Sequence, residues 1–212
     1  TRTMTPEFAD GYTYASMMNE ALITRNQEPE YSAEELEILR LGLDPDLYPN
    51  VDWQDLLLRN GAMTYRGSLN LSGGGNTARY FISGSYLNEQ GMYKVDENIK
   101  KDYDTNANSQ LYNYRMNVDV DITKTTLVKV GVSGSLRKMN EPGRAVNVWE
   151  ALMRQNPIEI PAMYSDGRFP TRGTGADTHP WVLTTQTGYN ETWENKIQTN
   201  ITLEQKLDFI TK

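Results

Sequence analysis

The chain has 212 residues, no cysteine, a single histidine and a formal net charge of −7. This acidic balance, without clustered Lys and Arg, excludes the counterion-release chemistry by which proteins bind nucleic acids. The lack of cysteine excludes disulfides and thiolate metal sites, and no apolar run approaches the ~18 residues of a transmembrane helix. A mean hydropathy of −0.65 is typical of soluble proteins and also of membrane β-barrels, in which only alternate strand residues meet lipid.

Two amphipathic helices are predicted near the start of the chain. The first begins at Pro6, after the capping hydroxyl of Thr5, and runs to about Thr24. The second opens at Ser32 with a capping-box pattern and ends at Gly42, which can adopt a left-handed cap. We expect both helices to pack against their own subunit, because an apolar stripe on a helix usually faces a core.

A short helix and a β-hairpin are predicted next. Asp52 can cap a helix from Trp53 to Arg59 by accepting hydrogen bonds from its first N–H groups. Alternating residues at 68–72 and 78–88 flank a Gly/Asn cluster, and this pattern predicts two strands joined by a turn. The expected cross-strand pairs are Leu71 with Tyr80 and Leu69 with Ile82.

Three further strands follow, each with apolar residues on one face and polar residues on the other. They are predicted at Leu111–Ile122, Leu127–Arg137 and Lys196–Phe209. The first two are joined by a tight turn at 123–126. A register that places Asp119 or Asp121 beside Lys129 would match opposite charges on the polar face.

Loop lengths help to distinguish a soluble sandwich from a membrane barrel, since alternation alone fits both. Short turns near Gly74 and Thr125 alternate with long connections at 89–110 and 138–195. This asymmetry favours an outer-membrane barrel, which has short periplasmic turns and long outer loops. Aromatic girdles are then expected at both rims, with Tyr80 at the inner rim and Tyr86, Tyr112 and Tyr114 at the outer one.

The long connection 138–195 is where we expect ligand contacts, because loops can vary over a rigid wall. It contains a predicted helix, Ala145–Arg154, and several aromatic residues. Such residues can stack on sugar rings, although loop packing explains them at least as well. The candidate ligand-binding residues are Trp149, Tyr164, Trp181, Tyr189 and Trp193.

No catalytic or metal site is predicted, and we expect no enzyme activity and no cofactor. His179 has no nucleophile elbow to support it, so its expected role is structural. The run Gly73-Gly74-Gly75 lacks the Lys-Ser/Thr of a phosphate loop and reads as a turn. The acidic and amide residues of 96–108 have calcium-loop spacing at their centre, but Ala107 replaces the turn glycine and Asn113 the bidentate Glu, so a solvated loop is preferred.

The run from Tyr48 to Gly91 resembles the SusC/RagA-type TonB-dependent transporters, which are outer-membrane barrels that import glycans or peptides. It carries YPNVDWQD at its start, then a Leu-x-Leu-Ser-Gly-Gly run and spaced Tyr, Ser and Gly residues. The resemblance continues more loosely through Phe8 to Ala21 and Asn156 to Gly167. The motif residues to which it assigns a structural role are Trp53, Gly73, Gly74, Tyr80, Tyr86 and Gly91.

The resemblance implies an all-β fold with helical loop insertions, namely a segment of an antiparallel up-and-down β-barrel with about five strands, too few to close. Residues 1–65 would form a helical extracellular region and 66–137 two β-hairpins of the barrel wall. Residues 138–195 would form a long extracellular loop and 196–212 a further barrel strand. Neither the plug domain nor the segment that engages TonB is found in the chain.

The resemblance also implies a location in the bacterial outer membrane, in contact with its lipid, and uptake of a glycan or oligopeptide. The implied partners are a SusD-like surface lipoprotein and the TonB complex, which would act through the missing plug region. The alternative is a soluble, surface-exposed β-sandwich that binds carbohydrate.

Overall fold

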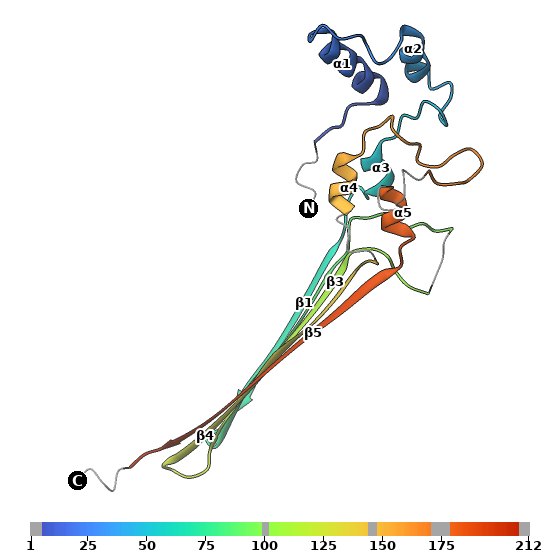
Figure 1. Cartoon of the computed structure of the whole chain (residues 1–212). Helices are drawn as coiled ribbons and strands as arrows, with labels where there is room; N and C mark the ends of the chain where they lie inside the picture. Colours follow the sequence, from blue (N-terminus) through green and yellow to red (C-terminus); the bar gives the residue numbers. More distant parts are fainter. Residues whose placement is uncertain (1–5, 99–101, 144–147, 171–178, 208–212) are drawn as a thin grey trace. The chain divides into compact units, whose positions relative to one another are not determined.

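The computed structural model describes residues 6–98, 102–143, 148–170 and 179–207, which fall into two compact units (Figure 1). The helical unit consists of Thr1–Gly61, Met92–Asn106 and Glu141–Asn190. The sheet unit consists of Ala62–Gly91, Ala107–Asn140 and Glu191–Lys212. Each unit therefore gathers segments that lie far apart in the sequence.

The sheet unit is built on one five-stranded antiparallel sheet in which every strand lies beside its neighbour in the sequence, in the order β1-β2-β3-β4-β5 (Figure 1). This up-and-down sheet is open, so β1 and β5 are its two edges. The strands are β1 (Thr64–Gly74), β2 (Ala78–Glu89), β3 (Asn108–Asp121), β4 (Thr126–Pro142) and β5 (Tyr189–Gln205). The predicted fold class, an incomplete barrel segment with helical insertions, is confirmed.

The first hairpin has a register two residues away from the predicted one. Leu71 lies opposite Ile82, and Tyr80 lies opposite Gly73. The predicted pairs of Leu71 with Tyr80 and Leu69 with Ile82 are therefore wrong. The difference arises because β1 continues through Gly74, so that the turn is shorter than expected and closes with a 2.8 Å hydrogen bond from the Gly75 N–H to the Ala78 carbonyl.

Because the register differs by an even number of residues, the predicted faces of the sheet are unchanged. One face is apolar, and its members on the three central strands pair with one another along the sheet. These residues are Tyr80, Ile82, Tyr86, Tyr112, Tyr114, Met116, Val118, Val120, Val128, Val130, Val132 and Leu136. The predicted pairing of Asp119 with Lys129 on the other face is confirmed.

The last two strands are longer than predicted. β4 continues past Arg137 to Pro142, and β5 begins at Tyr189 rather than at Lys196. Two residues assigned to the long connection, Tyr189 and Trp193, therefore belong to a strand. The predicted end of this strand at Phe209 lies outside the described residues.

The helical unit contains all the buried hydrophobic residues found in the described part of the chain. Its core packs Trp53 and Leu57 of α3 against Leu58, Leu152 of α4 and Ile160. The helices are α1 (Gly11–Ile23), α2 (Ala33–Leu41), α3 (Trp53–Leu57), α4 (Val148–Arg154) and α5 (Pro180–Thr185). The sequence pattern missed α5, and the predicted start of α4 at Ala145 lies outside the described residues.

Local hydrogen bonds define the helix ends. The capping box of α2 is confirmed, with the Ser32 hydroxyl accepting from the Glu35 N–H and the Glu35 carboxylate accepting from the Ser32 N–H. Gly42 ends this helix with a φ of 62°. The backbone N–H of Ser32 also lowers the pKa of Glu35, because it stabilises the charged carboxylate.

The predicted start of the first helix at Pro6 is wrong. Asp10 is the cap, and its carboxylate accepts a 2.7 Å hydrogen bond from the Thr13 N–H, which lowers the pKa of Asp10. The N–H of Gly11, the first residue of α1, donates to Asn50 Oδ1 at 2.8 Å. Pro6 instead lies before the helix, where its carbonyl accepts from the Gln54 side chain at 2.8 Å.

The short helix α3 ends at Leu57, before the predicted Arg59. Leu58 forms an isolated antiparallel bridge with Tyr93, and the Arg59 N–H donates to the Met92 carbonyl at 2.8 Å. The helix stops here because the Arg59 N–H, which a longer helix would direct to the Asp55 carbonyl, bonds to Met92 instead. The Asp52 cap is confirmed by its 2.8 Å hydrogen bond from the Asp55 N–H.

Candidate functional site

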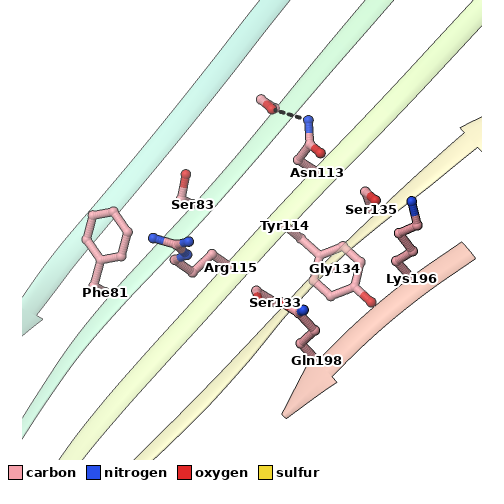
Figure 2. Close-up of a pocket in the computed structure, with 11 residues that line it drawn as sticks. Phe81, Ser83, Asn113, Tyr114, Arg115, Ser133, Gly134, Ser135, Lys196 and Gln198 are labelled. Carbon is pink, nitrogen blue, oxygen red and sulfur yellow. Dashed lines mark hydrogen bonds between the residues drawn. The ribbon is translucent and has the colours of Figure 1, made fainter. Parts of the chain in front are cut away.

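The two faces of the sheet differ sharply in chemistry, and this difference defines the first candidate site. The polar face carries serine, asparagine, glutamine and charged side chains on every strand, and a hydrogen bond joins Asn113 Nδ2 to Ser85 Oγ at 3.2 Å (Figure 2). Side chains on both faces of β1 are exposed along the whole strand. Neither face of this edge strand packs against a core.

An open pocket of about 470 Å³ lies on the polar face (Figure 2). We call it the serine pocket, because short serine side chains of β2 and β4 flank the longer side chains of β3. In the register, Arg115 lies between Ser83 and Ser133, and Asn113 lies between Ser85 and Ser135. Lys196 and Gln198 of β5 complete its polar rim.

Ion pairs occupy the part of the polar face nearer the hairpin turns. Arg79 Nη1 lies 2.9 Å from Asp121 Oδ2, and Lys129 contacts the carboxylate of Glu204. These side chains are well exposed, so each pair contributes at most a modest free energy in water. Both cations of this region therefore have a carboxylate partner.

The apolar face carries tyrosine rings packed over glycines. A Cβ added to Gly73 would lie 2.7 Å from Tyr80 Oη, and one added to Gly134 would lie 2.5 Å from Tyr114 Oη. In the register, Tyr86 faces Gly67, and its ring contacts Tyr112 with 4.9 Å between centroids. Aromatic side chains that cover cross-strand glycines compensate for the packing that glycine lacks.

Replacing Gly134 by alanine is expected to destabilise the sheet, because the new Cβ would lie 2.4 Å from the Lys196 carbonyl oxygen as well as against Tyr114. Overpacking of this kind typically costs about 1–3 kcal/mol. Gly84→Ala is the control, since no atom lies within 4 Å of its added Cβ. Urea unfolding of the complete protein in detergent should separate the two variants. Equal midpoints would contradict the close approach described for Gly134.

Two of the predicted ligand-binding aromatics are exposed side chains of the helical unit. Trp149 lies on α4 and is 42% exposed, and Tyr164 is 37% exposed. The turn after Tyr164 is closed by its N–H donating to the Arg168 carbonyl and by the Gly167 N–H donating to the Tyr164 carbonyl, each at 2.9 Å. Both rings are accessible to a ligand, but no contact between them is described.

The other three predicted aromatics have different surroundings. Trp181 packs partly buried against the core of the helical unit. Tyr189 contacts Tyr103 with 5.0 Å between ring centroids. Trp193 lies on β5 in the sheet unit, with Lys138 Nζ 4.9 Å from its ring centroid. Trp193 therefore belongs to a different unit from the other four aromatics.

The motif residues have clear structural roles. Trp53 is 1% exposed, and its indole N–H donates to the Asn156 carbonyl at 3.1 Å. Gly74 has a φ of 145°, and an added Cβ there would lie 2.4 Å from the Ala78 carbonyl oxygen, so only glycine fits without strain. The Gly91 N–H donates to Asn108 Oδ1 at 2.9 Å. The remaining three, Gly73, Tyr80 and Tyr86, belong to the glycine and tyrosine pairs.

His179 caps α5 inside the helical core. Its Nδ1 accepts from the Val182 N–H at 3.4 Å, and its ring meets Trp53 edge-on with 5.3 Å between centroids. Burial lowers the pKa of His179, because water cannot solvate the charged form of the buried ring. The surroundings are those of a structural residue, and α5 could have been found from the His179-Pro180 pair as a cap followed by proline at the first helical position.

The segment 96–108 uses its Asx side chains to hold backbone turns. Asp96 accepts from the Asn98 N–H at 2.9 Å, and Asp104 accepts from the Asn106 N–H at 2.8 Å. Asn106 itself is buried and accepts from the Tyr93 N–H at 3.2 Å. Within the described ranges, no group of three or more His, Cys, Asp or Glu side chains could hold a metal ion.

The fold and the segregated faces are those of an antiparallel up-and-down barrel wall with helical insertions. A search of solved structures finds the RagAB peptide importer in a closed-closed state, with a TM-score of 0.57, 15% identity, and coverage of 93% of this chain and 24% of the other. A second RagAB peptide transporter structure gives a TM-score of 0.52 at 16% identity, over 91% of this chain and 23% of the other. At these identities the similarity shows the fold alone. None of the described helices has the length and apolar character to cross a membrane.

Curated relatives add a similarity in sequence. The chain is 34% identical over 85 residues to TonB-dependent receptor P3 of Formosa agariphila, and 32% identical over 80 residues to TonB-dependent receptor P26 of that organism. These matches cover 40% and 38% of this chain, which spans 7% of the length of each relative. No protein-family model matches the chain. The sequence similarity is thus to TonB-dependent receptors, over less than half of this chain.

Proposed function

We propose that the chain contributes wall strands and outer loops to a TonB-dependent transporter in the bacterial outer membrane. The observation that carries this proposal is the sheet with one apolar face, one polar face and no core on either side of its edge strand. In a membrane barrel, the apolar face meets lipid and the polar face lines an aqueous interior. Both faces then have suitable surroundings without a second protein layer.

The tyrosines of the apolar face fit this orientation. Tyr86 and Tyr112 contact each other toward one end of the strands, and Tyr80 lies toward the hairpin turns. Rings that are apolar with one polar atom favour the membrane–water interfaces. Two levels of tyrosine therefore support two interfaces, as the sequence pattern predicts.

We further propose that the transporter is of the SusC/RagA type and that it acts with a SusD-like surface lipoprotein and the TonB complex. The motif run from Tyr48 to Gly91 and the fold shared with RagAB support this subtype. The relatives named above are receptors and importers, which favours transport over catalysis. The substrate class that this proposal implies is a glycan or an oligopeptide.

The exposed aromatics Trp149 and Tyr164 are the best of the proposed ligand contacts. Their rings are accessible, whereas Trp181 packs against the core and Trp193 lies on a strand. The rival function, a soluble β-sandwich that binds carbohydrate, needs a second sheet over the apolar face. All described strands belong to one sheet, which favours the transporter.

Cysteine labelling in the intact transporter tests the proposed topology. The hairpin turns at 75–77 and 122–125 would be periplasmic, and the helical unit would be extracellular. Cysteines at Glu30 and Asp166 are expected to react with a membrane-impermeant maleimide on whole cells, whereas one at Thr125 is expected to react only after the outer membrane is opened. The chain has no cysteine of its own to interfere. Labelling at Thr125 with protection at Glu30 would invert the topology.

A further inference from the structure

The serine pocket combines open space with unmatched positive charge. The guanidinium of Arg115 extends over β2 toward Ser83 and Phe81 (Figure 2). Because serines are its register neighbours on both adjacent strands, no long side chain lies directly opposite Arg115 in the register. The pocket therefore leaves the arginine accessible from the polar face.

None of the described residues that line this pocket is a carboxylate, although the chain as a whole is acidic. Within the described residues, Arg115 forms no ion pair, whereas Arg79 and Lys129 on the same face each contact a carboxylate. Lys196, the other cation of the pocket, lies 2.8 Å from Glu194 and is thereby largely matched. One positive charge remains without a partner.

We propose that the serine pocket binds a single carboxylate, held by the guanidinium of Arg115 and by the surrounding hydroxyl groups. A planar guanidinium donates two parallel hydrogen bonds to a carboxylate, and serine hydroxyls can donate to its remaining lone pairs. One unmatched charge fits one carboxylate, since a phosphate dianion would need a further free cation. The hydroxyls and amides that flank Arg115 suit an oxygen-rich ligand such as an acidic peptide side chain or a uronic acid.

This inference rests on the proposed function only for the route by which a ligand reaches the polar face. The carboxylate can come from a solute in the barrel interior or from another part of the same protein. Both sources present the same group to Arg115, and the experiment distinguishes them. The experiment measures the reactivity of a cysteine placed in the pocket, so its result does not depend on transport.

The test uses Ser133→Cys in the complete, purified transporter, with a folded-state gel shift to confirm that each variant folds. The rate at which the cysteine forms a mixed disulfide, with release of methanesulfinate, is measured with an anionic and a cationic methanethiosulfonate. Each rate is measured with and without tri-glutamate or tri-glutamine, both carrying a C-terminal amide so that only tri-glutamate has carboxylates. The anionic reagent is expected to react faster, and Arg115→Gln is expected to lower the anionic-to-cationic ratio at least ~5-fold, the effect of one nearby charge in water. Tri-glutamate, and not tri-glutamine, is expected to slow the reaction.

Two variants serve as controls. Arg79→Gln removes a cation that is already paired on the same face, so the ratio is expected to change less than twofold. Arg115→Lys retains the positive charge but loses the planar guanidinium that donates two parallel hydrogen bonds. It is therefore expected to retain the preference for the anionic reagent and to weaken protection by tri-glutamate.

Protection by tri-glutamate that Arg115→Gln abolishes would support a site for a free carboxylate. A cysteine that reacts with neither reagent until Arg115 is replaced would show that a carboxylate of the protein itself occupies the pocket. A ratio unchanged by Arg115→Gln would overturn the proposal. So would a freely reactive cysteine that tri-glutamate does not protect, because charge alone would then explain the reagent preference.

Discussion

Arginine in place of Met116 is expected to destabilise the folded protein by about 2–4 kcal/mol, the cost of a cation on the lipid face near the bilayer midplane. Met116 lies on the apolar face between Ile82 and Val132 in the register, between the two levels of tyrosine. If that face meets lipid, the new charge has no water to solvate it. The measurement is urea unfolding in lipid vesicles, followed by the gel shift between folded and unfolded forms.

The control is the same substitution one residue along the strand. Asn117→Arg places the charge on the polar face, between Phe81 and Gly131 in the register. Its effect is expected to stay within about 0.5 kcal/mol, as for an exposed surface change. Equal destabilisation by the two variants would refute the assignment of one face to lipid, whatever the fate of the serine pocket.

Truncation of Trp53 to alanine is expected to have the largest effect on the helical unit, about 3–5 kcal/mol, because it empties the centre of a small core. The side chain is almost fully buried, contacts His179 and donates its indole proton to the Asn156 carbonyl. Its loss leaves a cavity and an unsatisfied carbonyl. Hydrogen exchange of α4 and α5 in the complete protein should report faster opening.

Trp149→Ala is the matched control, since it removes the same side chain from an exposed position of the same unit. Amide protection in α4 and α5 is expected to remain near that of the parent, while ligand binding weakens if Trp149 contacts the ligand. Fast exchange in both variants would mean that the helical unit is equally sensitive to loss of an exposed tryptophan. Slow exchange in both variants would contradict the central role of Trp53 in the core.

The strand faces could be predicted from the sequence because strand side chains alternate strictly, so Val118, Val120 and Val130 had to share one side. The caps at Ser32 and Asp52 were equally local and were confirmed. Pro6 misled the prediction, because a favourable first-turn residue does not show which later residue the tertiary contacts select. The Gly11 N–H has its partner in Asn50, far along the chain.

The serine pocket was beyond the sequence pattern for a different reason. Alternation places Arg115 on the polar face, but the strand register decides which residues of β2 and β4 lie beside it and whether one of them is a carboxylate. The helix α5 and the position of Trp193 on β5 likewise depend on contacts and strand limits that no short window of sequence contains.

The glycine and tyrosine pairs explain how the chain resolves an ambiguity that alternation leaves open. A slip of β1 against β2 by two residues keeps every side chain on its proper face, so hydrophobicity barely opposes it. Such a slip in the direction of the predicted register would place Tyr80 opposite Leu71 rather than Gly73, and would remove the close contact between the Tyr80 ring and Gly73. Contacts of this kind therefore select one register of β1 against β2. The alternation of polar and apolar residues alone would allow every register that differs from it by two residues.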